Sequence, residues 1–111
     1  TVHMFDRDRF VRFKDGAYFY NVGRGTSVDQ TALVQALKSG KLGGAGLDVT
    51  DPEPLPEGDP LWDAPNVIIT AHTAGATPYF RQRVLDLFSE NLRRYQAGKD
   101  LLNVVDIGRG Y

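Results

Sequence analysis

The sequence predicts an α/β fold in which a parallel sheet is flanked by helices. Segments rich in β-forming or apolar residues alternate along the chain with segments whose apolar residues recur at helical spacing, which is typical of parallel sheets. A short apolar run at residues 67–70 is of the kind that such sheets bury on both faces. The 111 residues suit one domain, and the hydrophobic content of 41% is enough for a core.

The first predicted helix and strand come from the N-terminal segment. Residues 6–14 suit a short helix because Asp6 can cap its N-terminus and two phenylalanines lie on one side. Gly16 ends this helix. Residues 17–22 are rich in β-formers and predict a strand, after which glycines on both sides of Arg24 predict a tight turn.

The middle of the chain predicts a helix, a strand and a long loop. Asp29 can cap a helix that Gly40 ends. The glycine-rich apolar segment at residues 42–49 predicts a strand whose small residues leave room for a helix to pack closely. Residues 50–65 contain five of the six prolines and therefore predict a loop of fixed shape.

A long amphipathic helix is predicted for the C-terminal part. Thr77 and Pro78 suit a hydroxyl N-cap followed by proline in the first turn, and Gly98 ends the helix. Residues 101–105 predict a last strand. The apolar stripe of the helix consists of Phe80, Val84, Leu87, Phe88, Leu92 and Tyr95.

Composition argues against several classes of function. The formal net charge of −1 gives no electrostatic footprint for nucleic acid or an anionic membrane. Without cysteine the chain can form no disulfide and no thiolate metal site, so we expect no metal and a cytoplasmic location. No apolar run approaches the roughly 20 residues of a membrane span.

Three residues with complementary chemistry each follow a predicted strand. They are Arg24, Glu53 and His72. An arginine can clamp a carboxylate with two hydrogen bonds, a histidine can exchange a proton near neutral pH, and a bonded glutamate can orient that histidine. Because ligands of an open α/β sheet bind outside the carboxyl ends of the strands, we expect these residues to converge on one cleft.

Each candidate also allows an interpretation without catalysis. His72 could be a turn histidine bonded to the backbone, Glu53 a solvated acid in an acidic loop, and Arg24 a surface arginine at the end of a helix. Asp48 lies at the end of an apolar strand, where an unpaired charge is costly. It could equally bind a ligand or cap a turn.

Six short segments, taken in their order and spacing, resemble the D-isomer-specific 2-hydroxyacid dehydrogenase family. The match is to the C-terminal part of its nicotinamide-cofactor-binding domain, covers nearly the whole chain, and favours the functional interpretation of the three candidates. The segments are His3-Met4-Phe5, Gly16-Ala17-Tyr18, Asn21-Val22-Gly23-Arg24-Gly25, Gly44-Ala45-Gly46-Leu47-Asp48-Val49, Glu53-Pro54-Leu55-Pro56 and Pro65-Asn66-Val67-Ile68-Ile69-Thr70-Ala71-His72.

The resemblance implies a partial Rossmann-like, doubly wound sheet that is truncated on its N-terminal side. No G-x-G-x-x-G motif follows a strand in this sequence, although the family carries that phosphate-binding loop upstream of the matched region. Residues 1–100 are then the C-terminal part of the cofactor domain. Residues 101–111 are a tail that returns toward a substrate domain which this chain lacks. The intact parent is expected to be a homodimer and the isolated chain inactive.

The implied activity is hydride transfer between NAD or NADP and a D-2-hydroxy acid/2-keto acid pair. By resemblance His72 is the acid/base, Glu53 orients it, Arg24 binds the substrate carboxylate, and Asp48 accepts a hydrogen bond from the nicotinamide carboxamide. The expected cofactor-binding residues are Asn21, Val22, Gly23, Asp48, His72 and Gly75. The choice between NAD and NADP stays open, because the residue that decides it follows the glycine loop.

A non-catalytic alternative remains. The C-terminal-binding transcriptional corepressors resemble the same family and keep a similar triad, so an NAD-binding corepressor-like protein of the same fold fits the three residues too. The absence of a basic or low-complexity tail favours the enzyme.

Overall fold

The computed structural model describes residues 1–110 and contains two compact units. The first unit spans Thr1–Ala74 and contains the sheet, and the second begins at Gly75. The elements are α1 (Arg7–Val11), β1 (Ala17–Asn21), the 3-10 turn η1 (Gly25–Ser27), α2 (Gln30–Lys38), β2 (Leu42–Leu47), β3 (Val67–Ile69) and α3 (Phe80–Gln96). No helix within residues 1–110 is long and apolar enough to cross a membrane.

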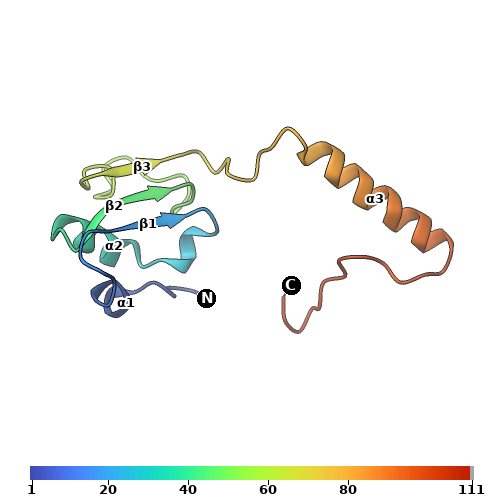
Figure 1. Cartoon of the computed structure of the whole chain (residues 1–111), viewed down its shortest axis with the longest axis horizontal. Coiled ribbons are helices and arrows are strands. Elements are labelled where there is room, and N and C mark those ends of the chain that lie inside the picture. Colours follow the sequence, from blue (N-terminus) through green and yellow to red (C-terminus); the bar gives the residue numbers. More distant parts are fainter. Residues whose placement is uncertain (111) are drawn as a thin grey trace. The chain divides into compact units, whose positions relative to one another are not determined.

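The three strands form a parallel sheet in the order β1-β2-β3, which confirms the predicted fold class (Figure 1). Phe19, Ala45 and Val67 occupy matching register positions on the face that packs against the core. Helix α2 packs on β2 with its buried side, and α1 packs against α2. The most deeply buried side chains are Phe10, Leu33 and Leu61.

The opposite face of the sheet lies open in the first unit. Tyr18, Tyr20 and Ile68 are each more than 60% exposed there. A Cβ atom added to Gly44 or Gly46 would lie 2.9 or 2.7 Å from the ring of Tyr18 or Tyr20. The glycines of β2 therefore make room for tyrosine rings of the neighbouring strand and not for a helix. The expectation that the third strand is buried on both faces is also wrong at Ile68.

Two predicted helix starts are confirmed. The side chain of Asp6 accepts a hydrogen bond from the Arg9 amide at 3.0 Å, and the side chain of Asp29 accepts one from the Ala32 amide at 3.0 Å. The first helix ends at Val11 and is shorter than predicted. Gly98 follows α3 with a φ of 62°, a conformation that glycine adopts freely.

The start of α3 and the segment after it differ from the sequence predictions. The N-cap is Tyr79 and makes no side-chain capping bond, while Thr77 uses its backbone carbonyl to accept from the Phe80 amide at 3.0 Å. Residues 101–105 form no strand. The side chain of Asn91 on α3 bonds both the amide and the carbonyl of Leu102, at 2.7 and 3.1 Å, and thereby takes the groups that a neighbouring strand would need.

The apolar stripe of α3 is real but exposed in its own unit. Its six residues are each at least 37% exposed. Periodicity predicted the element correctly because the helix is long and strongly periodic.

Candidate functional site

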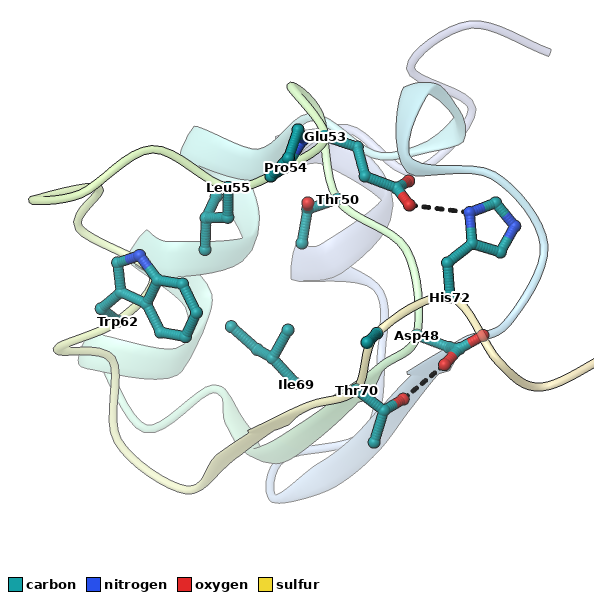
Figure 2. A pocket seen from close by; sticks show the side chains of 10 residues that line it. Asp48, Thr50, Glu53, Pro54, Leu55, Trp62, Ile69, Thr70 and His72 are labelled. Atoms are coloured by element: carbon teal, nitrogen blue, oxygen red, sulfur yellow. Dashed lines mark hydrogen bonds and ion pairs between the residues drawn. The ribbon is translucent and has the colours of Figure 1, made fainter.

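A cleft of about 580 Å³ lies within the first unit at the carboxyl ends of β2 and β3 (Figure 2). Polar groups from the two strand ends line one side of it and apolar side chains of the proline-rich loop line the other. The lining residues are Asp48, Thr50, Glu53, Pro54, Leu55, Trp62, Ile69, Thr70, Ala71 and His72. The site is thus where an open parallel sheet binds its ligands.

His72 and Glu53 form a hydrogen-bonded contact in this cleft. The Nδ1 atom of His72 lies 2.7 Å from Oε1 of Glu53, which confirms that the two side chains are within hydrogen-bond reach. When Nδ1–H donates to the carboxylate, Nε2 is left to exchange a proton with a ligand. Figure 2 shows that this second ring nitrogen points away from Glu53. Both side chains are about 40% exposed or more, so reactants can reach them.

The loop that carries His72 is tied to a single buried carboxylate. Asp48 is 5% exposed. Its Oδ1 atom accepts hydrogen bonds from the hydroxyl of Thr70 and the amide of Thr73, and its Oδ2 atom accepts one from the amide of Ala74 at 2.7 Å. These bonds fall on both sides of His72, whose φ of 53° lies in the left-handed region.

These contacts stabilise the ionised form of Asp48. The Thr70 hydroxyl, and after it the amides of Ala74 and Thr73, hold the pKa of the Asp48 carboxyl below its ordinary value against the opposing effect of burial. Of the two interpretations of Asp48, the structure shows turn capping. A ligand role remains compatible with it, because Oδ2 accepts one bond and a carboxylate oxygen can accept two.

Arg24 does not line the cleft. It is exposed in the turn after β1, and its guanidinium donates to the carbonyl of Gly23 at 2.8 Å. The turn is shaped by Asn21, whose side-chain amide donates to the Arg24 carbonyl at 2.9 Å and whose side-chain oxygen accepts from the Gly23 amide at 3.1 Å. The buried Asn21 side chain thus makes two hydrogen bonds within this turn.

The Arg24 turn nevertheless abuts the loop that leads to Glu53. A Cβ atom added to Gly25 would lie 1.9 Å from the carbonyl oxygen of Thr50. Only glycine allows this approach, so Gly25 lets the backbones of the two loops meet. Gly23 has no such constraint, since the nearest atom to an added Cβ is the side-chain oxygen of Asn21 at 3.6 Å.

The remaining cofactor candidates occupy different surroundings. Val22 and Gly23 are exposed just beyond the carboxyl end of β1. Gly75 is the first residue of the second unit. Residues 1–110 contain no group of three His, Asp or Glu side chains arranged to hold a metal ion.

Thr70 and Trp62 are lining residues that the sequence analysis missed. Thr70 offered a signal, because it is a hydroxyl residue at the end of an apolar strand two positions before His72. Trp62 is 54% exposed and its indole donates to the Pro56 carbonyl at 2.9 Å. No local pattern distinguishes it from a surface aromatic residue.

Fold and site together define a parallel α/β protein with a hydrogen-bonded histidine–glutamate pair at the carboxyl edge of its sheet. Residues 1–74 match the family model described as D-isomer specific 2-hydroxyacid dehydrogenase, NAD binding domain. The chain belongs to this family, as the six sequence segments indicated.

Known proteins are similar to this chain in sequence and structure over almost its whole length. It is 41% identical over 106 residues to a glyoxylate reductase of Korarchaeum cryptofilum, covering 96% of this chain and 32% of that protein. It matches a D-isomer specific 2-hydroxyacid dehydrogenase of Xanthobacter autotrophicus, crystallised with NADPH and MES, at 42% identity and a TM-score of 0.90, covering 100% of this chain and 45% of the other.

A second solved structure is similar. It is an NADPH-dependent glyoxylate/hydroxypyruvate reductase of Sinorhizobium meliloti with NADP and sulfate, with 34% identity, a TM-score of 0.89, and coverage of 100% of this chain and 36% of the other. The chain spans about a third of the length of the curated relatives it matches.

Proposed function

We propose that this chain supplies the acid/base pair and part of the cofactor site of an NAD(P)-dependent oxidoreductase that interconverts D-2-hydroxy acids and 2-keto acids. The observation that carries the proposal is the 2.7 Å contact between His72 and Glu53 at the carboxyl ends of parallel strands, in a chain of the dehydrogenase family. In this proposal the chain is one part of a longer, homodimeric, cytoplasmic protein.

His72 moves the proton in the proposed reaction. In the direction of reduction, Nε2–H of the imidazolium donates its proton to the carbonyl oxygen at C2 while C2 gains a hydride, so that the keto acid becomes a hydroxy acid. In the direction of oxidation, the neutral Nε2 takes the hydroxyl proton as hydride leaves C2. Glu53 holds the opposite ring nitrogen and stabilises the charged imidazolium.

Arg24 binds the substrate carboxylate in this proposal. Its guanidinium has five N–H donors in a planar fork, and it is exposed beside the loop that leads to Glu53. Two parallel N–H bonds would fix the keto acid with its C2 carbonyl toward His72.

Groups near the carboxyl ends of β1 and β2 also fit a nicotinamide cofactor. The cofactor, when bound, supplies the hydride in reduction and accepts it in oxidation. The exposed backbone at Val22 and Gly23 and the remaining acceptor position of Asp48 would hold its nicotinamide end. The proposed cofactor is NAD or NADP, and two similar structures were crystallised with NADPH or NADP.

A small 2-keto acid is the proposed substrate. The support comes from relatives named glyoxylate reductase and glyoxylate/hydroxypyruvate reductase. These names also favour an enzyme over a corepressor-like binding protein.

The test is steady-state kinetics of the full-length protein with a panel of 2-keto acids. His72→Ala should lower kcat by about 10²- to 10⁴-fold, since that is what positioned proton transfer contributes. His3→Ala is the matched control, because His3 is the other histidine of the chain and lies outside the cleft. Unchanged turnover in His72→Ala would refute the acid/base role.

A further inference from the structure

His72 occupies a strained position that needs support from outside its own loop. The last ladder bond of β3 runs from the Thr70 amide to the Leu47 carbonyl at 2.9 Å, so the chain leaves the sheet directly before His72. A φ of 53° is disfavoured for residues other than glycine. An imidazole on such a loop keeps one orientation only if its flanks are fixed.

One buried carboxylate fixes both flanks. Asp48 bonds the Thr70 hydroxyl two residues before His72, and the amides of Thr73 and Ala74 one and two residues after it. Asp48 is itself anchored, because its amide donates to the Asn21 carbonyl at 2.9 Å and its side chain is buried. Asp48 thereby holds the backbone on each side of His72 at a fixed place relative to the sheet.

We propose that Thr70 and Asp48 are a positioning pair that holds His72 in the orientation in which Nδ1 meets Glu53. The consequence for catalysis rests on the proposed function, but the positioning itself does not. Each partner is needed for a different reason. Asp48 supplies the acceptor atoms, and the Thr70 hydroxyl joins the end of β3 to the same oxygen that fixes Thr73.

Thr70 separates positioning from cofactor binding. A carboxylate that only bound the nicotinamide carboxamide would tolerate loss of the Thr70 hydroxyl, since no cofactor contact is assigned to that residue. A carboxylate that positions His72 would not. The informative variants are therefore Thr70→Val, which keeps the shape but removes the hydroxyl, and Thr70→Ser, which keeps the hydroxyl.

The experiment uses the full-length protein with ¹⁵N-labelled histidine. The ring nitrogen shifts of His72, assigned by their loss in His72→Ala, report whether Nδ1 carries the proton directed at Glu53. Hydrogen exchange, measured by mass spectrometry on the peptide containing Thr73 and Ala74, reports whether the backbone after His72 stays hydrogen-bonded to Asp48. In Thr70→Val the ¹⁵N shifts of the His72 ring should no longer show a proton fixed on Nδ1, and hydrogen exchange of this peptide should be about 2- to 10-fold faster. Thr70→Ser should show the wild-type ring shifts and the wild-type exchange rate.

Kinetics supply the second readout. Thr70→Val should lower kcat about tenfold and leave the Kd for NADPH and NADH unchanged, the loss corresponding to one net hydrogen bond. Wild-type ring shifts and exchange in Thr70→Val would overturn the proposal. So would an altered Kd with unchanged ring shifts. If the ring and exchange effects occur but the wild-type protein reduces no keto acid, positioning stands and the proposed function fails.

Exchange in the peptide that contains Leu33 serves as the folding control, because Leu33 is 1% exposed in the core. If Thr70→Val also speeds exchange there, Asp48→Asn provides the second variant. It replaces an acceptor oxygen by an amino group and should release the same loop. An unchanged His72 ring in that variant would likewise overturn the proposal.

Discussion

At the scale of residues, chemistry and spacing predicted the His72–Glu53 contact but not its support. Both residues follow strands of one parallel sheet, so topology alone brings their loops to the same edge. Asp48 was ambiguous because a carboxylate at a strand end serves a ligand or a turn equally well. Its three partners come from residues 70–74, and only the folded loop reveals them.

Arg24 gives a prediction that depends on geometry rather than charge. Arg24→Lys keeps the positive charge but loses the planar fork, so it should raise KM for the keto acid and also lower kcat. Steady-state kinetics of the full-length protein would measure both. Arg109→Lys is the control, since Arg109 also lies between two glycines, Gly108 and Gly110, but belongs to the second unit. An unchanged KM together with an unchanged kcat would exclude Arg24 from the substrate site.

The low pKa of Asp48 predicts how stability depends on pH. The folded pKa lies below the unfolded value of about 3.9, so the unfolded state binds more protons in acid. Asp48 therefore stabilises the fold above about pH 4, and this stabilisation is lost as the pH falls through the folded pKa. Urea unfolding of Asp48→Asn should show a flatter acid limb than the wild type.

Asp15 is the control for that measurement. Its pKa is also lowered, by a hydrogen bond and charge attraction from Lys41, but its side chain is 89% exposed. Salt screens exposed charges more than buried ones. About 1 M NaCl should therefore abolish the change that Asp15→Asn makes in the pH dependence of the unfolding free energy, and preserve the change made by Asp48→Asn. Loss of both effects in salt would contradict the assignment of Asp48 as a buried anchor.

At the scale of elements, the caps predicted at Asp6 and Asp29 formed, whereas the cap predicted at Thr77 and the strand predicted at residues 101–105 did not. The caps at Asp6 and Asp29 were predictable because a cap bonds amides three residues away. The segment at 101–105 has the composition of a strand, but the side chain of Asn91 takes the backbone groups of Leu102. Strand formation requires a partner strand, which composition cannot supply.

The contact between the loops after β1 and β2 gives a prediction about Gly25. Gly25→Ala forces its Cβ into the Thr50 carbonyl and should destabilise the fold by about 1–3 kcal/mol, as overpacking does. Gly23→Ala is the matched control and should change the unfolding free energy by less than about 0.5 kcal/mol. Urea unfolding of both variants would decide, and equal stabilities would show that the two loops separate without cost.

At the scale of the whole molecule, the first unit by itself leaves both edges and one face of its sheet open. β1 and β3 are the outer strands, and Tyr18, Tyr20 and Ile68 are exposed on the side away from α2. Parallel sheets are normally covered on both faces. An edge strand also presents unpaired backbone groups to other chains. The 111 residues alone should therefore associate with one another.

The same chain should bind a nicotinamide cofactor poorly. The pyrophosphate of a dinucleotide is held by backbone amides of a glycine-rich loop at a helix N-terminus, and no G-x-G-x-x-G motif occurs in these 111 residues. In the proposed function the residues at the carboxyl ends of the strands would hold only the nicotinamide end. Calorimetric titration with NADH, run beside light scattering, would measure both properties. A monodisperse monomer that binds NADH with a Kd of about 1 μM, equivalent to about 8 kcal/mol, would contradict this account, because the nicotinamide end would then suffice for binding.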